Sequence, residues 1–81
     1  MRLASTRDSH LSSAQLCRER GWTAGTLIEG DEGYGMTVIR ITAVGERDIL
    51  AVAVSHKGVA YPDPLETTWI LQCRDWRTVE R

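Results

Sequence analysis

The stretch TVIRITAVGERDILAVAVS, residues 37–55, decides the fold. Two runs rich in β-branched and small apolar residues, 37–44 and 49–55, flank a short turn of sequence Gly-Glu-Arg-Asp. Such runs on either side of a short turn predict an antiparallel β-hairpin. Both faces of strand 49–55 are apolar, which is typical of a strand buried on both sides. We therefore expect one face of this strand to line the core and the other to lie against a helix.

The size and composition indicate one small soluble domain. The chain has 81 residues, of which 42% are hydrophobic and 26% charged, with a net charge of −1. The absence of a long basic run disfavours sequence-independent binding of nucleic acid. No apolar run approaches the ~18 residues of a membrane span, and the N-terminus lacks the apolar stretch of a signal peptide. These features predict a cytoplasmic protein that makes no membrane contact.

The residues before the hairpin predict an arm followed by a helix. Residues 1–10 are polar and have no period, so we expect a flexible N-terminal arm ahead of a single domain over 11–81. Ser12 is a good N-cap, and Gln15 three residues later completes a capping box. Gly21 ends the helix at the C′ position. Because this helix has only about two turns, it must dock on the rest of the domain to be stable.

The remaining segments predict a mainly β fold, or α+β by count: a short N-terminal helix and a five-stranded antiparallel barrel. Three glycines within residues 30–35 predict an irregular loop. The other predicted elements are strands at 26–29, 66–72 and 78–80, a short strand or strand end at 59–61, and a 3₁₀ turn at 74–76. From about residue 25 to residue 80, this order of element lengths resembles an SH3-like small barrel, without the polyproline-binding signature.

A second resemblance is carried by particular runs of sequence. These are RGWT at 20–23, GDEGYG at 30–35, ITAVGE at 41–46 and WILQCRDW at 69–76. They resemble a group of short, uncharacterised proteins encoded by bacteriophages and prophages, and the resemblance covers most of residues 13–79. It implies a viral or prophage origin, a bacterial host cell and a role against that host. It nominates no catalytic residue.

Three groups of residues are candidates for contact with a partner. The first is the acidic pair in the glycine-rich loop, the second is the aromatic residues in or beside loops, and the third is the Arg-Asp-Trp corner near the C-terminus. As partner-binding residues we predict Asp31, Glu32, Tyr34, Tyr61, Arg74 and Trp76. Each group also has a purely structural interpretation: solvated loop carboxylates, aromatic filling of a core that lacks Phe, and a capped turn.

The sequence contains no convincing catalytic or metal-binding set. The four residues of metal-binding type, His10, Cys17, His56 and Cys73, include no closely spaced pair of the kind that structural zinc sites use. No motif places a base beside either cysteine, so we interpret both as buried, reduced thiols. We expect no metal, no cofactor and no enzymatic activity.

These observations favour a function by binding. The leading hypothesis is a phage or prophage accessory protein that inhibits a host protein or immune effector complex, of the anti-CRISPR or another anti-defence type. An acidic loop would suit competition with nucleic acid for a basic groove. The alternatives are a nucleic-acid-binding barrel that uses Arg40, Arg47, Arg74 and Arg77, a phage structural or assembly protein, and a sponge for a small ligand. The expected state is a monomer or small homo-oligomer.

Overall fold

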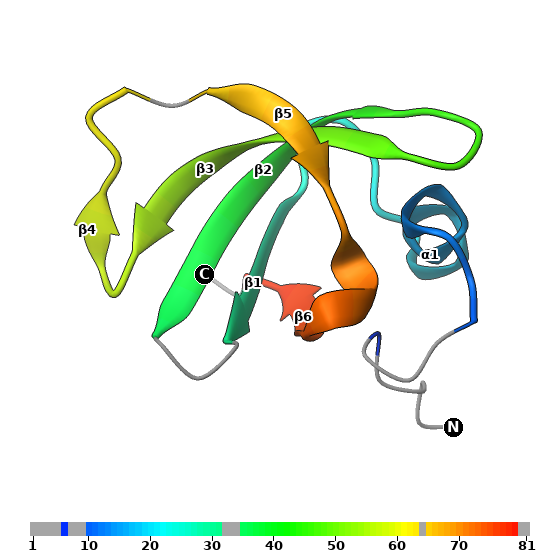
Figure 1. Ribbon diagram of the computed structural model, residues 1–81, viewed down its shortest axis with the longest axis horizontal. Coiled ribbons are helices and arrows are strands. Elements are labelled where there is room, and N and C mark those ends of the chain that lie inside the picture. Colours follow the sequence, from blue (N-terminus) through cyan, green and yellow to red (C-terminus); the bar gives the residue numbers. More distant parts are fainter. Residues whose placement is uncertain (1–5, 7–9, 32–34, 64, 80–81) are drawn as a thin grey trace.

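The computed structural model describes residue 6 and residues 10–31, 35–63 and 65–79, with the backbone only at residue 73. It is mainly β: one short α-helix accompanies an antiparallel sheet of six strands (Figure 1). The elements are α1 (Ser13–Arg20), β1 (Leu27–Asp31), β2 (Met36–Val44), β3 (Ile49–His56), β4 (Val59–Ala60), β5 (Glu66–Trp69), the 3₁₀ helix η2 (Leu71–Cys73) and β6 (Asp75–Thr78).

The predicted hairpin is confirmed as β2 and β3, closed by a turn in which the Gly45 amide donates to the Asp48 carbonyl at 2.9 Å. The strand order is β4-β3-β2-β1-β6, and β5 also pairs with β3. Thus β3 pairs with β5 over its first half and with β4 at its end, both along the edge opposite β2. Register shifts at two points mark bulges in the hairpin, and bulges bend and twist the strands they interrupt. The sheet consequently curls around one interior face.

Local sequence signals determine α1 as predicted. The Ser12 hydroxyl accepts from the Gln15 amide, and the Gln15 side chain accepts from the Ser12 amide, so both halves of the capping box are present. Gly21 ends the helix with φ of 75°, the left-handed conformation that favours glycine. The described residues contain no helix long and apolar enough to cross a membrane.

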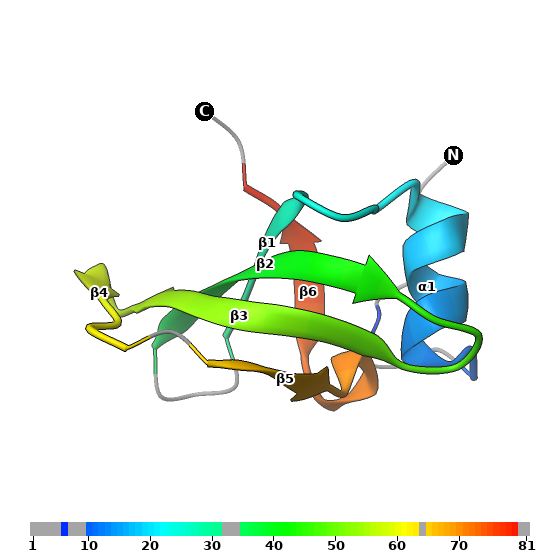
Figure 2. The same ribbon diagram turned by 90° about the horizontal axis from the view of Figure 1, so that it is seen from above.

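The prediction that α1 covers the second face of β3 is wrong. The helix lies beside the turn between β2 and β3 (Figures 1 and 2). There the Arg18 guanidinium donates to the carbonyls of Gly45 and Glu46, at 2.8 and 2.9 Å, and the Ala14 amide donates to the Arg47 carbonyl. Because α1 closes the end of the curled sheet, it packs on the interior face, and the outer face of β3 stays partly exposed.

Three element boundaries near the C-terminus also differ from the prediction. The 3₁₀ turn is Leu71–Cys73 rather than 74–76, and the last strand is Asp75–Thr78 rather than 78–80. The isolated pair Val59–Ala60 forms a strand of its own, which raises the strand count to six. The reason is tertiary: Trp76 opposes Gly30 in the pairing of β6 with β1, and that pairing draws residues 75–78 into the sheet.

The core lies between the interior face of the sheet, α1 and η2. Its largest fully buried side chains include Trp76, Leu16, Ile28, Ile39 and Ile41, and Leu11 and Trp69 pack against it. Trp22, which directly follows the helix, is also buried there. The three tryptophans therefore supply the aromatic burial of a chain without Phe, as the composition indicates.

Thr6, in the predicted N-terminal arm, is buried and docks on β6. Its hydroxyl donates to the Arg74 carbonyl at 2.7 Å and accepts from the Trp76 amide at 2.8 Å. A single side chain thereby supplies the donor and the acceptor that a neighbouring strand would offer to this edge. At Thr6 the chain ahead of α1 is therefore part of the folded domain.

Candidate functional site

The Arg-Asp-Trp corner is built on a glycine in β1. Gly30 faces the interior, and a Cβ atom there would lie 2.8 Å from the Arg74 Cδ and 2.9 Å from the Trp76 Cδ2. Both side chains consequently rest directly on the backbone of β1. The Arg74 guanidinium lies over the Trp76 ring, 4.9 Å from its centroid, in a cation–π arrangement.

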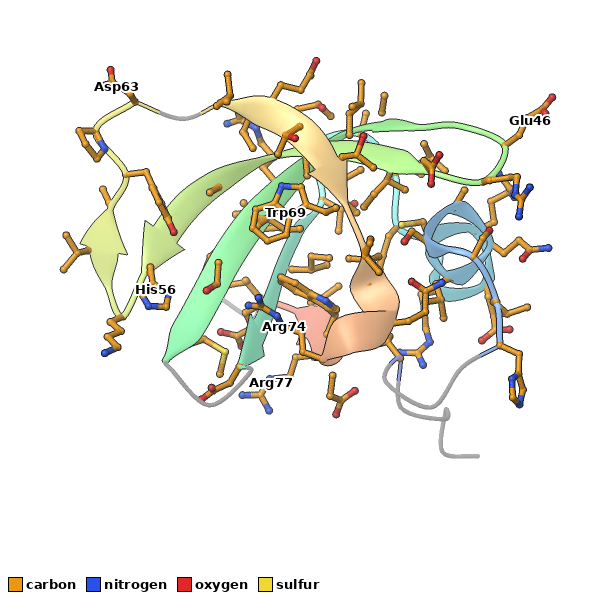
Figure 3. The ribbon with its side chains drawn as sticks, in the orientation of Figure 1. Glu46, His56, Asp63, Trp69, Arg74 and Arg77 are labelled. Carbon is orange, nitrogen blue, oxygen red and sulfur yellow. The ribbon has the colours of Figure 1, made fainter. Side chains whose placement is uncertain are left out.

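The rest of the corner is equally enclosed. Trp69 meets Trp76 edge-on, with ring centroids 6.0 Å apart. Figure 3 shows Trp69 and Arg74 together on the interior side of the sheet. Only 1% of Trp76 and 8% of Arg74 is exposed. The structure thus places these two predicted contact residues in or beside the core, where they stabilise the fold and offer a partner little surface.

The acidic loop prediction falls partly outside the described residues. Asp31 is exposed at the end of β1, where it pairs with Met36 on one side and Asp75 on the other. Glu32 and Tyr34 lie outside the described residues. Gly35 has φ of 113°, as an irregular glycine-rich segment requires.

Tyr61 and Asp31 lie at different strands, with two other strands of the sheet between them. Tyr61 directly follows β4, whereas Asp31 ends β1, and β3 and β2 separate these two strands. The Tyr61 amide donates to the Val54 carbonyl at 3.0 Å, and 40% of the residue is exposed. The predicted contact residues that the structure describes, Asp31, Tyr61, Arg74 and Trp76, therefore do not form one surface.

Exposed apolar side chains, most of them not identified by the sequence prediction, lie along the sheet edge formed by β4 and β5. We call this edge the apolar rim: Val59 and Tyr61 lie at β4, beside the last residues of β3, and Leu65 and Ile70 flank β5, beside the first residues of β3. Val59 is 70% exposed, Leu65 75% and Ile70 62%. One sequence pattern indicated that Ile70 is exposed. The alternation in residues 66–72 puts Ile70 with Thr68 and Gln72, on the face opposite Trp69 and Leu71.

A shallow, open pocket adjoins the apolar rim. Its volume is about 300 Å³, and the residues that line it are His56, Val59, Ala60, Tyr61 and Pro62. His56 is held in place by a 2.8 Å hydrogen bond between its Nδ1 and the Thr37 hydroxyl. In Figure 3, His56 and the loop at Asp63 lie at the opposite end of the molecule from Glu46 in the β2–β3 turn.

The arginines of the nucleic-acid hypothesis come from different parts of the fold. Arg74 is buried, and Arg77 pairs with Glu29 across β6 and β1, with 3.3 Å between the Arg77 Nε and the Glu29 carboxylate. Arg40 lies on the outer face of β2, and Arg47 belongs to the turn beside α1. A basic stripe of four arginines is not formed.

The residues of metal-binding type are dispersed in the described structure. Within the described residues, no three or more His, Cys, Asp or Glu side chains are grouped so as to hold a metal ion. Cys17 is buried on α1, as predicted, and burial raises the pKa of its thiol to about 11, although the neighbouring Arg18 charge partly opposes this. The thiol therefore keeps its proton at neutral pH, in keeping with an inert core residue.

The raised pKa of Cys17 predicts a loss of stability in alkaline solution. Over the interval between its ordinary pKa, 9.0, and the native value of about 11, the unfolded chain releases the thiol proton while the native chain retains it. Stability is therefore unaffected below about pH 9 and falls as the pH rises toward about 11. Urea unfolding across this range should show the fall, and Cys17→Ala should flatten it. An equally steep fall in that variant would assign the effect to other groups.

Taken together, these features define a small, mainly β domain with one capping helix, an enclosed Arg–Trp corner and an exposed apolar rim. Residues 11–81 match the model of the family described as Domain of unknown function (DUF7241), and the chain belongs to that family. No curated protein matches the chain. No solved structure matches it either, so the SH3-like resemblance remains a prediction.

Proposed function

We propose that this chain is a non-enzymatic protein-binding domain and that the apolar rim is its main contact surface. The observation that carries the proposal is the exposure of Val59, Leu65 and Ile70, three large apolar side chains that come from one segment of twelve residues, 59–70. Several exposed apolar side chains along one sheet edge mark an interaction site more often than isolated ones do.

The open pocket beside the rim adds a place for an anchor residue. Interfaces concentrate their binding energy in a few side chains that fill well-packed pockets. The space of about 300 Å³ between His56, Tyr61 and Pro62 suits an apolar side chain from a partner. Tyr61 contributes a ring for packing and a hydroxyl at its tip, a combination that is favoured at interfaces.

The resemblance to phage and prophage proteins supplies the biological setting of this proposal. The partner is then a host protein or an immune effector complex in the bacterial cytoplasm, and the outcome of binding is inhibition. Asp31, exposed at the end of β1, belongs to a second and separate surface, where acidic charge would favour a basic region of the partner.

The test is a pull-down that compares a variant of the apolar rim with a variant of the β2–β3 turn. The wild-type chain, the rim variant Val59→Asp/Leu65→Asp and the control Arg47→Glu are each used to recover proteins from bacterial host lysate, followed by quantitative mass spectrometry. The rim variant should recover the partner at least tenfold less well, because loss of apolar anchors costs more than about 1.4 kcal/mol. The control changes an exposed residue of the β2–β3 turn and should recover it normally.

Circular dichroism separates lost binding from lost folding, and both rim positions are exposed enough for the fold to tolerate a charge. Equal recovery by the rim variant would move the contact away from this surface. If Asp31→Arg alone abolished recovery, the acidic surface would be the contact instead.

A further inference from the structure

β3 carries apolar side chains on both of its faces. Ile49 and Ala51 face the interior and are buried, whereas Leu50 and Val52 alternate with them on the outer face. Leu50 is exposed and Val52 is partly exposed, because α1 packs at the end of the sheet instead of over it. A strand that is apolar on both faces is normally covered on both faces. The described chain covers only one.

The outer face carries a short row of side chains with a positive charge at one end and a negative charge at the other. If a second copy were turned by a half rotation onto this face, each charge would meet its opposite. The strand register places Arg40 opposite Val52, and Val52 opposite Glu66. Arg40 on β2 and Glu66 on β5 are thus two strands apart, at about 10 Å, with Val52 midway between them. Both charged residues are exposed. Neither side chain forms an ion pair or hydrogen bond with any described residue.

We propose that this outer face binds a second copy of the chain. The two-fold axis would run parallel to β3, between the two copies and above Val52. It would place Arg40 of each copy over Glu66 of the other, and the two Val52 side chains against each other. A two-fold contact uses the same patch on both subunits, so that patch must be complementary to itself. Charges of opposite sign at equal distances on either side of an apolar centre meet this requirement.

Other features of the face fit the same occupant. Leu27 extends the row beyond Arg40, and Leu50 lies opposite Ala43 in the neighbouring row, so apolar groups surround the charges. The row has no net charge, which gives it no electrostatic preference for nucleic acid or for a strongly charged protein. Since the row consists of only a few side chains, we expect the contact to bury less than the ~800 Å² per partner of a standard interface, and the dimer to be reversible and to depend on concentration.

This inference does not depend on the proposed function, since the apolar rim and the Arg40–Glu66 row share no residue. Its test uses single charge reversals. In Arg40→Glu both row positions are negative, and in Glu66→Arg both are positive, so each variant repels its own copy. When the two variants are mixed, both cross-copy pairs become opposite in sign again. In the double variant, Arg40→Glu with Glu66→Arg, two identical copies again bring opposite charges together at positions 40 and 66.

Light scattering coupled to gel filtration, at up to millimolar chain concentration, gives the outcome. The wild type should approach twice the chain mass of 9.1 kDa. Each single reversal should stay at the monomer mass, and the equimolar mixture and the double variant should regain the dimer mass. Arg47→Glu, at the β2–β3 turn, serves as the matched control and should dimerise normally. A monomeric wild type, or a mixture that stays monomeric while each variant is folded, would overturn the proposal.

Discussion

Replacement of Trp76 by alanine is expected to reduce the free energy of unfolding by about 3–5 kcal/mol, the usual cost of truncating a buried large aromatic residue. Trp76 is almost completely buried, receives the edge of Trp69, and separates the Arg74 side chain from the rest of the core. For a domain of this size, whose total stability is roughly 4–12 kcal/mol, that loss leaves little of the native state at elevated temperature. Urea unfolding followed by circular dichroism measures it.

Two variants make the Trp76 prediction specific. Trp76→Phe keeps an aromatic ring and removes an indole N–H that has no hydrogen-bond partner among the described residues, so it should lose much less stability. Tyr61→Ala removes an aromatic residue from the exposed rim and should change stability by under ~1 kcal/mol. If Trp76→Ala unfolded at the same urea concentration as the wild type, the core described above would be wrong.

Replacement of Gly30 by alanine is expected to reduce stability by about 1–3 kcal/mol, through overpacking. At most strand positions this substitution is stabilising by about 0.5–1 kcal/mol, because glycine loses more conformational freedom on folding. The sign reverses at Gly30 because a methyl group there meets the Arg74 side chain and the Trp76 ring below normal contact distance. The arginine chain is able to move aside, whereas the indole ring is held by its neighbours.

The matched test for Gly30 is the double variant Gly30→Ala/Arg74→Ala. Removal of the Arg74 side chain relieves one of the two clashes, so the cost of Gly30→Ala should be smaller in the Arg74→Ala background than in the wild type. Urea unfolding of the four chains gives this coupling. A stabilised Gly30→Ala single variant would show that the corner does not rest on β1 as described.

Prediction from the sequence succeeded where neighbouring residues carry the information. The capping box of Ser12 and Gln15 and the C′ glycine at position 21 use hydrogen bonds that close within four residues. The β2–β3 hairpin is likewise local, because apolar runs and a short turn determine it together. The burial of Cys17 was also predicted, from the chemistry of a thiol with no neighbouring base.

Prediction of the candidate site was weaker because its parts come from distant strands. Trp76 and Arg74 looked like an exposed corner, but the register of β6 with β1 puts them over Gly30, forty-four residues from Arg74. The glycine itself was interpreted as part of a loop, although it belongs to β1, where its lack of a side chain admits two others. Val59 and Leu65 gave no periodic signal of exposure, since each stands next to a turn or a proline.

By itself, therefore, the sequence determined the hairpin, the capped helix and the mainly β class, since these depend on periodicity, turns and hydrogen bonds between near neighbours. Only the tertiary structure decided which face of β3 the helix leaves uncovered, that Trp76 is buried in the core, and where the apolar rim lies. Those outcomes depend on strand register and on close contacts between residues far apart in the chain. No local pattern encodes such contacts, because their energy exists only once the strands have paired.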